Sequence, residues 1–494
     1  MQQYILGIDI GTGSTKAVAL GFDGEMLDVA QQYYPVKSPQ PGYAEQDPKL
    51  IFDAFKSCVA AVTGKLGSPV AISFSSAMHS IMPVDKNGEA MADMIIWADA
   101  RSQPIADRIR SSGDGVAIYR KSGTPIHAMT PLCKLIWWRE NQPDLFHGAA
   151  RFISIKEYIW YRLFADYQVD YSLASATGLF DIETLHWNPD ACKLAEVNED
   201  QLSKPVDTTY HRSDIDQKLA SELKLNPETH FVIGSSDGCC ANLGSYVDTE
   251  GVAAITIGTS GAVRITGKQP VINDEAMIFN YLLYERTFVS GGAVNNGGNA
   301  MQWLIRTFLN HDKVEEAAYN EFFDKAKTVP AGSDGLVFLP YLNGERAPIW
   351  DTRACGMFFN ITERHTQAHF LRAGLEGICL ALMNVLQTLE QSSVPVKQVN
   401  ISGGFINSPL WVQTLADITG KKLVIVQQED ASAMGAIFLA VKALGLPQAI
   451  MKRPEKEEAT IEPDEKNQAV YQQVFKRFRR LTARLDELTK TTSE

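Results

Sequence analysis

The chain has 494 residues, 45% of them hydrophobic and 21% charged, a composition typical of a soluble globular protein large enough for two or more domains. Its formal net charge of -12 disfavours a nucleic acid or an anionic membrane as the main partner, and no apolar run approaches the roughly 20 residues of a membrane span. The first residues show no signal peptide, and the seven cysteines are scattered without a Cys-x-x-Cys motif, so we expect reduced thiols and a cytoplasmic protein.

The first predicted element is a buried strand over residues 4–10, which a single carboxylate, Asp9, interrupts. The turn after it reads Gly11, Thr12, Gly13, Ser14 and Thr15. Glycines let the backbone approach a ligand closely, and amides and hydroxyls donate hydrogen bonds to anions. An acid beside such a turn suits a metal-bound phosphate, although an ordinary hairpin turn fits the same residues. The glycine spacing matches neither a Walker P-loop nor a dinucleotide-binding fingerprint.

Strands over 16–20 and 26–34 and a helix over about 48–66 are expected next. A strand over 70–74 then delivers Met78 and His79, which suit the wall of a small-molecule site. A lone histidine at a strand end is, however, more often structural.

A polar cluster follows around Trp97, with Asp99 and Arg101 close by. An aromatic face beside donors and acceptors is a common way to bind a polyol, but an Asp–Arg pair around a tryptophan can equally brace a loop. Further on we expect a loop up to about 130, a helix that begins at Pro131, and an aromatic-rich helix over 152–161.

The stretch 230–244 predicts a short apolar strand, a turn of small residues and a helix, with Asp237 at the turn. Capping a helix N-terminus is a common role for aspartate. A base in a ligand cleft is equally compatible with this position.

The polar stretch 247–251 is a plausible domain boundary, and the residues after it resemble the start of the chain. An apolar strand over 252–257 again ends in a turn of small residues, here Gly258, Thr259 and Ser260, but without an acid like Asp9. A metal would therefore be held mainly by the first half. Later elements include a helix over 367–390, a strand that ends at the pair Gly403 and Gly404, and a charged tail with a helical apolar stripe.

Taken together, these residues resemble the FGGY family of carbohydrate kinases, which shares a superfamily with actin, heat-shock chaperone ATPases and hexokinase. The resemblance runs from residue 4 to about residue 446. Its most specific motifs are Gly-Ile-Asp-Ile-Gly-Thr-Gly at 7–13, Gly-Ser-Ser-Asp-Gly at 234–238, Thr-Ile-Gly-Thr-Ser-Gly at 256–261, Gly-Glu-Arg-Ala-Pro at 344–348 and Ser-Gly-Gly-Phe at 402–405. The first family signature is similar to residues 129–141, where Trp138 departs from the usual pattern, and the second to residues 356–376.

The resemblance implies an α/β protein with two ribonuclease-H-like ATPase domains of the actin and hexokinase superfamily around a central cleft. Residues 1–248 would be an N-terminal domain that binds the sugar and carries the catalytic base. Residues 249–450 would be a C-terminal nucleotide-binding domain, and residues 451–494 a charged helical tail.

The resemblance also implies ATP and Mg²⁺, with a role for each matching residue. Asp237 would be the general base, and Asp9 and Asp237 would face the metal. The nucleotide would contact Thr12, Gly13, Ser14, Gly258, Thr259, Ser260, Gly403, Gly404 and Asn407. The substrate would contact Met78, His79, Trp97, Asp99, His127 and Asp237.

Within the family, the runs 74–80, 97–101 and 123–131 are most similar to the branch that acts on D-gluconate, although Ala128 stands where that branch has proline. We therefore expect phosphorylation of the C6 hydroxyl to 6-phospho-D-gluconate. The substrate carboxylate should meet a cation or several donors, and Arg101, His127 and Lys134 are the candidates.

Other functions remain open on this evidence. A xylulose kinase or another polyol or ketose kinase is the nearest alternative, and an actin-like or chaperone-like ATPase or a phosphohydrolase is more remote. We expect a small-molecule partner, no nucleic acid, no membrane and a homodimer.

Overall fold

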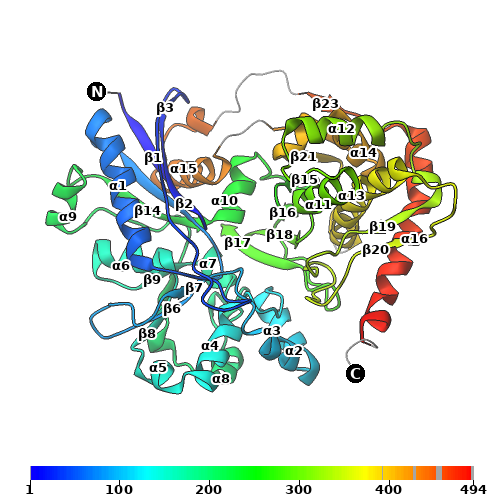
Figure 1. The fold of residues 1–494 in the computed structure, drawn as a ribbon. Helices are drawn as coiled ribbons and strands as arrows, with labels where there is room; N and C mark the ends of the chain where they lie inside the picture. The colour runs from blue at the N-terminus through cyan, green and yellow to red at the C-terminus, as the bar shows by residue number, and fades with distance from the viewer. Residues whose placement is uncertain (1, 392, 427–429, 452–458, 491–494) are drawn as a thin grey trace. The chain divides into compact units, whose positions relative to one another are not determined.

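The computed structural model describes residues 2–391, 393–426, 430–451 and 459–490. The chain forms two compact units. The first contains Met1–Tyr246, Gly267–Val289 and Gln428–Glu455, and the second contains Val247–Thr266, Ser290–Gln427 and Lys456–Glu494. The units are thus more interleaved along the chain than a simple division at residue 248 (Figure 1).

The first unit is built on a six-stranded sheet with the strand order β13-β14-β5-β1-β2-β3. Strands β1, β5 and β14 are parallel, and β2, β3 and β13 are added antiparallel. The carboxyl ends of parallel strands meet at one edge of a sheet, where ligands commonly bind. The strands are β1 (Tyr4–Ile10), β2 (Ser14–Gly21), β3 (Met26–Tyr33), β5 (Ala71–Ser76), β13 (His211–Arg212) and β14 (His230–Ser236).

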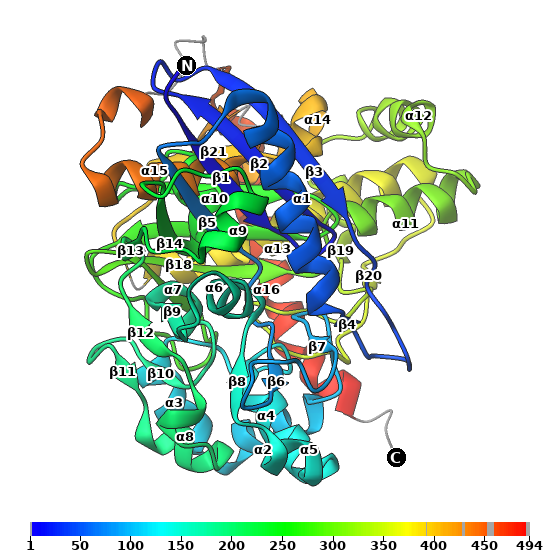
Figure 2. The ribbon, with the colours of Figure 1, turned by 90° about the vertical axis from the view of Figure 1, so that its left-hand side faces the viewer.

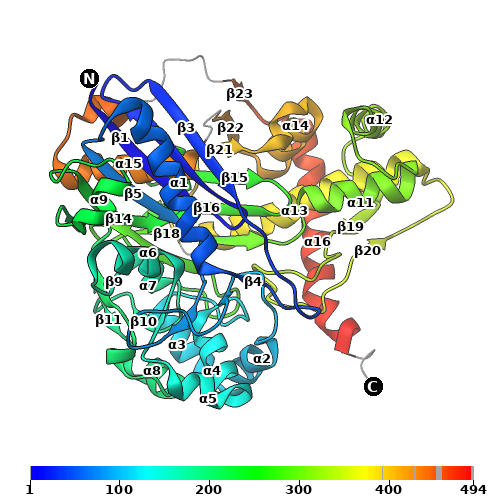
Figure 3. The ribbon, with the colours of Figure 1, turned by 60° about the vertical axis from the view of Figure 1, so that its left-hand side comes forward.

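Helices pack on both faces of this sheet (Figure 2) (Figure 3). On one face, Leu6 and Ile8 pack with helices α1 (Pro48–Leu66) and α6 (Ile155–Phe164). On the other face, Ile5 packs with α10 (Asp237–Gly244) and α15 (Ala431–Leu444). Because successive side chains of a strand point to opposite faces, this packing explains why β1 is apolar at nearly every position and confirms the predicted buried strand.

Helices α10 and α15 cross at very short range. A Cβ atom on Gly435 would lie 1.9 Å from the carbonyl oxygen of Cys240, and one on Gly244 would lie 2.0 Å from that of Ala431. The missing side chains therefore let the two backbones touch.

Shorter elements complete the first unit. The helix predicted over 152–161 begins only at Ile155, because residues 151–153 pair with β6 as strand β8 and Ser154 forms a capping box with Glu157. The strands are β4 (Glu45–Gln46), β6 (Met82–Val84), β7 (Met94–Ile95), β8 (Arg151–Ile153), β9 (Gln168–Asp170), β10 (Phe180–Asp181), β11 (His186–Trp187), β12 (Lys204–Val206) and β17 (Phe279–Tyr284). The helices are α2 (Gln103–Ser112), α3 (Asp114–Ser122), α4 (Pro131–Asn141), α5 (Pro143–Gly148), α7 (Tyr171–Ser175), α8 (Pro189–Ala195) and α9 (Gln217–Glu222).

The second unit repeats the central pattern of the first. Its strands run in the order β18-β16-β15-β21-β22-β23, with an antiparallel β15–β16 hairpin beside parallel β21, as the β1–β2 hairpin lies beside parallel β5. The sequence echo at 252–261 therefore reflects a structural repeat. The strands are β15 (Val252–Ile257), β16 (Gly261–Gly267), β18 (Thr287–Val294), β21 (Gln398–Ser402), β22 (Lys422–Ile425) and β23 (Thr460–Ile461), and a separate hairpin joins β19 (Val337–Leu339) and β20 (Met357–Phe359).

The helices of the second unit are α11 (Gly298–Leu309), α12 (Glu316–Ala326), α13 (Gln367–Gln391), α14 (Pro409–Thr419) and α16 (Glu465–Lys490). Within the described residues, α13 has the length and apolar composition that a membrane span requires. Its most apolar 18-residue window is 83% buried in the protein, as expected of a core helix.

Helix α16 forms part of the core of the second unit, although its sequence is highly charged. Phe475, Phe478 and Leu485 of the predicted apolar stripe are buried and Leu481 is half-buried, whereas the side chain of Leu488 lies outside the described residues. The Tyr471 hydroxyl donates to Glu376 on α13 at 2.8 Å, and Arg372 donates to the same carboxylate at 2.9 Å. The C-terminal helix thus completes a buried polar network.

Candidate active site

A group of charged residues lies at the carboxyl edge of the first unit's sheet. Asp9, near the end of β1, accepts a hydrogen bond from the Ser75 hydroxyl at 2.8 Å and faces Lys16 in the β1–β2 register. Lys16 forms an ion pair with Asp430, which immediately precedes α15. Burial, reinforced by the charge of Asp237, raises the pKa of Asp9 from 3.8 to about 7.

Asp237 is the first residue of α10 and does not cap that helix. Ser236 is the cap, and its hydroxyl accepts a hydrogen bond from the backbone N–H of Cys239 at 3.4 Å. One oxygen of the partly buried Asp237 carboxylate accepts from the N–H of Gly238 at 2.7 Å. Ser236 thus fills the capping role that the sequence left open for Asp237, and a role of Asp237 as a base stays a prediction.

Three side chains fix the turn between β1 and β2. Tyr34 donates to the carbonyl of Gly11 at 2.6 Å, and Gln46 donates to the carbonyl of Thr12 at 2.7 Å. The indole N–H of Trp97 donates to the Thr12 hydroxyl at 2.9 Å. That hydroxyl therefore accepts from the indole and keeps its own proton to donate. This hydrogen bond joins Trp97, a predicted substrate contact, to Thr12, a predicted nucleotide contact.

The neighbouring turn residues differ in their surroundings. Gly13 is exposed, whereas the Ser14 hydroxyl accepts from Gln31 of β3 at 2.8 Å and is thereby tied to the sheet. Met78 is partly buried and lines a cavity of about 10 Å³ together with Thr12 and Trp97.

His79 is buried, with only 8% of its surface exposed, and its backbone is left-handed, with a φ of 65°. Its Nδ1 lies 2.8 Å from the carbonyl oxygen of Ala176, so Nδ1 carries the proton. Its Nε2 lies 3.3 Å from the hydroxyl of Tyr281. These contacts favour a structural role for the ring in this conformation, while its use as a substrate contact stays a prediction.

Lys134 and Arg101 are both committed to protein partners. Lys134 is fully buried and donates to the carbonyls of His79 at 2.6 Å and Ile96 at 2.9 Å, and burial lowers its pKa to about 7. Arg101 is ion-paired with Glu45 and Asp99, at 2.6 and 2.7 Å.

Asp99 is buried by the same arrangement and also accepts from the N–H of Ala44 at 2.6 Å. The Asp99–Arg101 pair thus braces the loop, which was the alternative to direct sugar binding, and neither Arg101 nor Lys134 is placed to meet a substrate carboxylate.

His127 is therefore the candidate that we retain for the substrate carboxylate. Its Nδ1 accepts from the N–H of Met129 at 3.2 Å, so the proton of the neutral ring sits on Nε2. A neutral N–H donor is consistent with this geometry. A cationic ring would lose the Met129 hydrogen bond.

A cavity of about 890 Å³ lies in the second unit, within the size range of ligand pockets. Gly258 and Thr259 of the β15–β16 turn line it, as do Gly404 and Asn407, the two ends of a short 3₁₀ helix. Aromatic side chains supply flat apolar surface in the same cavity, namely Tyr319, Phe323, Phe405 and Trp411. Such a lining suits a nucleoside.

Two other predicted nucleotide residues shape this cavity indirectly. Gly403 has a φ of 111°, and a Cβ atom there would lie 2.2 Å from the carbonyl oxygen of Ile257, so only glycine fits. The carbonyl of Ser260 accepts from Gly258 inside the turn at 2.9 Å. The N-terminus of α11 holds the turn, since Gly298 donates to the Gly258 carbonyl at 2.8 Å.

Several residues of the site were not predicted from the sequence. Lys16 could have been found, because the hairpin register places it opposite Asp9. Asp430 gave no signal, since 414 residues separate it from Lys16. Ser75 directly follows the strand predicted over 70–74, and the parallel register pairs it with Asp9.

The carboxylates of the first unit fit a magnesium ion. Within the described ranges, no group of three or more His, Cys, Asp or Glu residues is arranged to hold a metal. Magnesium needs no such group, because it is usually bound by one or two carboxylates together with phosphates and water. Asp9 and Asp237 repel each other, and a divalent cation would relieve that repulsion.

The repeated α/β units, the glycine turns and the carboxylates define a two-domain phosphotransferase fold of the actin and hexokinase type. Comparison with known families makes this specific. The N-terminal domain of the FGGY family of carbohydrate kinases matches residues 4–244, and the C-terminal domain of that family matches residues 253–444. The chain belongs to the FGGY family of carbohydrate kinases, and the predicted family and fold class are confirmed.

Individual relatives carry two different substrate names. A gluconokinase of Bacillus subtilis (strain 168) is 39% identical over 454 residues, which cover 90% of this chain and 88% of that protein. The crystal structure of a gluconate kinase from Lactobacillus acidophilus is 33% identical with a TM-score of 0.94, covering 99% of this chain and 100% of that chain. A ligand-bound xylulose kinase from the same organism is also 33% identical, with a TM-score of 0.95 and the same coverage. The kinase family implies ATP and a small sugar as substrates.

Proposed function

We propose that this protein is a gluconokinase, which transfers the γ-phosphoryl group of ATP to the C6 hydroxyl of D-gluconate and forms 6-phospho-D-gluconate and ADP. The observation that carries the proposal is the 39% identity to a gluconokinase over 90% of the chain, against 29% to a xylulose kinase of Staphylococcus epidermidis over 99% of the chain. The runs 74–80, 97–101 and 123–131 support the same substrate, because they resemble that branch of the family.

Asp237 is the proposed general base. The C6 oxygen attacks the γ-phosphorus, the bond from that phosphorus to the β–γ bridging oxygen breaks, and the hydroxyl proton passes to the Asp237 carboxylate. The electron pair of the broken bond stays on the bridging oxygen, which becomes a terminal oxygen of the β-phosphate of ADP. The transition state of phosphoryl transfer is loose, so the base mainly orients the hydroxyl and needs no raised pKa.

The phosphate-binding groups are proposed to be the two glycine turns. In the first unit, the Thr12 hydroxyl, oriented by Trp97, is a donor for phosphate oxygens. In the second unit, the turn at Gly258 and Thr259 forms part of the large cavity's wall. Asp9 and Asp237 would hold Mg²⁺, which when bound neutralises phosphate charge.

His127 is the proposed contact for the gluconate carboxylate. It is placed in the loop before α4, and the bond from Met129 fixes its tautomer. An Nε2–H donor makes a stronger hydrogen bond to a charged carboxylate oxygen than to the neutral carbonyl or hydroxyl oxygens of a ketose such as xylulose.

A xylulose kinase is the second candidate, because the xylulose kinase structure superposes on this chain as well as the gluconate kinase structure does. The deciding experiment measures ADP release from ATP with gluconate, xylulose, ribulose and glycerol under identical conditions. We expect the highest kcat/KM with gluconate. Higher kcat/KM with xylulose would reject the proposed substrate, and ADP release without any acceptor would reject the kinase.

The cytoplasmic location, the homodimer and the lack of nucleic-acid or membrane partners also stay predictions from the sequence. Light scattering coupled to size-exclusion chromatography tests the homodimer directly. A mass near the monomer's 54.5 kDa would contradict it.

A further inference from the structure

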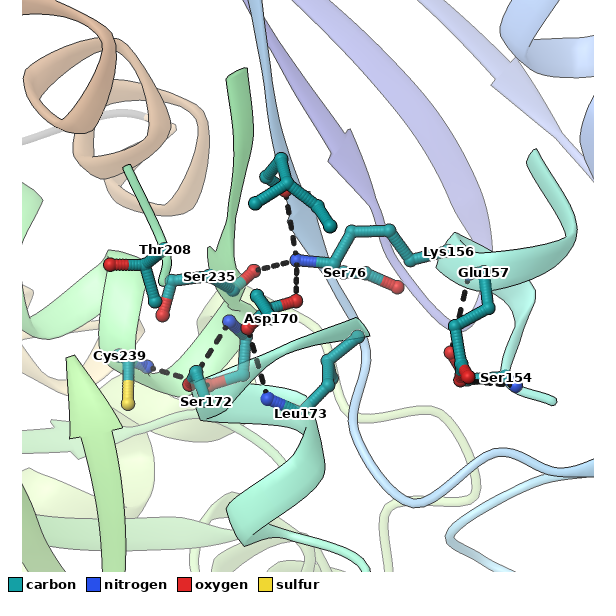
Figure 4. A network of polar contacts seen from close by, with 12 residues as sticks. Ser76, Ser154, Lys156, Glu157, Asp170, Ser172, Leu173, Thr208, Ser235 and Cys239 are labelled. Carbon is teal, nitrogen blue, oxygen red and sulfur yellow. Dashed lines mark hydrogen bonds and ion pairs between the residues drawn. The ribbon is translucent and has the colours of Figure 1, made fainter. Parts of the chain in front are cut away.

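A buried ion pair lies beneath Asp237, in the core of the first unit. Lys156 of α6 and Asp170 at the end of β9 have side chains only 2% and 0% exposed, and their charged atoms are 2.6 Å apart. The ammonium group also donates to the carbonyls of Ile233 at 3.1 Å and Ser235 at 3.0 Å (Figure 4). Two donors of the lysine thus have carbonyl acceptors, and the Asp170 carboxylate balances its charge, as a buried cation requires.

The two carbonyls belong to an irregular part of β14, the strand that leads to Asp237. The pairing of β14 with β5 shifts between Val232 and Ser235, which marks a bulge. At its centre Gly234 has a φ of 70°, and a Cβ atom there would lie 1.8 Å from the carbonyl oxygen of Phe74. Bulges re-aim the residues that follow them, and the carbonyls at this bulge are bound by Lys156.

Asp170 acts on the same turn from the other side, through α7. Its second oxygen caps α7 by accepting from the N–H of Leu173 at 3.0 Å. On the first turn of α7, the Ser172 hydroxyl donates to the Ser236 hydroxyl at 2.8 Å and accepts from the N–H of Ser236 at 3.3 Å. Ser236 in turn caps α10, where Asp237 is the first residue.

The far end of α7 reaches the predicted substrate side. The carbonyl of Ala176, the residue that ends this helix, holds the ring of His79 at Nδ1. One short helix, capped by Asp170, therefore touches both the cap beside Asp237 and the ring of His79.

We propose that Lys156 and Asp170 are positioning residues that fix the orientation of Asp237 for phosphoryl transfer. Lys156 binds the carbonyls of Ile233 and Ser235, in the bulge just before Ser236. Asp170 caps α7, whose Ser172 binds Ser236, the residue before Asp237. The inference rests on the proposed role of Asp237 as the base. Neither residue touches a substrate, because both side chains are buried in the protein.

The positioning role predicts an effect on turnover that a purely stabilising role does not. A small displacement of a catalytic group can reduce the rate strongly, whereas substrate affinity depends on other residues. Replacing both members of a buried ion pair by neutral residues leaves no uncompensated charge, so the fold can survive the change.

The test compares the wild type with the double variant Lys156→Met/Asp170→Asn and with Ser172→Ala. Asparagine at 170 keeps an oxygen for capping α7. We expect kcat of the double variant to fall about 10- to 100-fold, with both KM values within about twofold of wild type and a similar thermal midpoint. Ser172→Ala should also lower kcat, but less, because it removes only the hydrogen bonds between α7 and Ser236, whereas the double variant releases the carbonyls of the bulge.

The control is Arg162→Met/Glu89→Gln, which neutralises an ion pair on the outer side of the same helix α6. It should retain the wild-type kcat. A folded double variant with the wild-type kcat would overturn the inference, and if that variant does not fold, a wild-type kcat for Ser172→Ala would overturn it.

The assay uses the acceptor on which the wild type is fastest. If the wild type prefers xylulose, the proposed substrate is rejected, but the variants can still be compared with the wild type on xylulose, and that comparison tests this inference. A wild type that transfers phosphate to none of the four acceptors would contradict both.

Discussion

Asp237, the proposed base, is the first residue of helix α10. The amide groups of the first turn of α10 favour a negative charge at this position. Ser236, and not Asp237, caps the helix. The carboxylate lies at the end of β14, where it accepts a hydrogen bond from the N–H of Gly238. These are the properties expected of a base that must accept a proton and orient a hydroxyl at neutral pH.

We predict that Asp237→Asn abolishes phosphoryl transfer while nucleotide binding is nearly intact. The change preserves size and removes the proton acceptor, which typically costs on the order of 10²- to 10⁴-fold in rate. Turnover is measured by ADP release and nucleotide affinity by calorimetry. Ser432→Ala is a nearby control, because its hydroxyl donates to the backbone carbonyl of Asp237 and not to the carboxylate. Wild-type turnover of Asp237→Asn would rule out the role of base.

Asp9 should make stability depend on pH in the absence of divalent cations. Its pKa is raised from 3.8 to about 7, chiefly by burial and then by Asp237, so between these values the folded state binds a proton that the unfolded state has lost. Stability from this group therefore falls as pH rises from about 4 to 7 and is lowest above 7. Asp9→Asn removes this penalty.

The expected result is a thermal midpoint for Asp9→Asn that exceeds wild type by more at pH 8 than at pH 5, in EDTA. Asp144→Asn, at an exposed position, should give no such pH-dependent difference. Added Mg²⁺ with ATP should stabilise the wild type more than Asp9→Asn. An equal difference at both pH values would show that Asp9 titrates normally.

At the scale of elements, the junction between β21 and the following 3₁₀ helix separates two roles of adjacent glycines. Gly403 permits the backbone to pass against Ile257, whereas a Cβ atom on Gly404 meets nothing within 4 Å and Gly404 lines the large cavity. The first glycine serves the fold, and the second leaves space for the ligand.

We therefore predict opposite outcomes for two alanine substitutions at this junction. Gly403→Ala should destabilise the protein by about 2 kcal/mol or more, because it combines a positive φ with a backbone clash. Gly404→Ala should keep the wild-type thermal midpoint and raise the KM for ATP. A lowered midpoint for Gly404→Ala with an unchanged KM would contradict the nucleotide assignment of the cavity.

The helices and strands were largely predictable, because the sequence signals for them lie within short stretches of the chain. The buried run of β1, its glycine turn and the strand–turn–helix around Asp237 are encoded within about ten residues each, and the structure has them where the pattern predicted. The helix expected over 152–161 was misplaced at its start, since nothing in the apolar pattern distinguishes strand β8 from a helical turn.

The contacts inside the site were much less predictable, because they join residues that are distant in sequence. Lys134 was considered for a substrate carboxylate, but it is buried and holds the carbonyls of two loops. The choice of Ser236 over Asp237 as the cap depends on one hydroxyl, and both residue types are common caps. The sequence likewise contains no periodic pattern that would predict the pairing of Lys156 with Asp170.

At the scale of the whole molecule, helix α16 is a structural part of the second unit. Its Tyr471 hydroxyl both donates to Glu376 and accepts from Arg372 at 2.7 Å, and all three side chains are buried. Glu376 also accepts from the N–H of Gly332 and the hydroxyl of Ser333. The highly charged helix α16 therefore contributes buried side chains to the core of the second unit.

We predict that Tyr471→Phe lowers the free energy of unfolding by about 1–3 kcal/mol, since it leaves two buried charged groups each short of one partner. Urea unfolding followed by circular dichroism measures the change. Tyr33→Phe is the matched control, because Tyr33 is 78% exposed and should change stability little. Equal effects of the two substitutions would mean that the network contributes nothing.

The interleaving of the units has a consequence for biosynthesis. The sheet of the first unit begins with β1 at residue 4, yet one of its faces is covered by α15, more than 400 residues later on the chain. During translation, the apolar side chains that α15 covers, such as Ile5 and Val18, stay uncovered until almost the entire polypeptide has left the ribosome. The first unit thus cannot finish folding before most of the second has been synthesised.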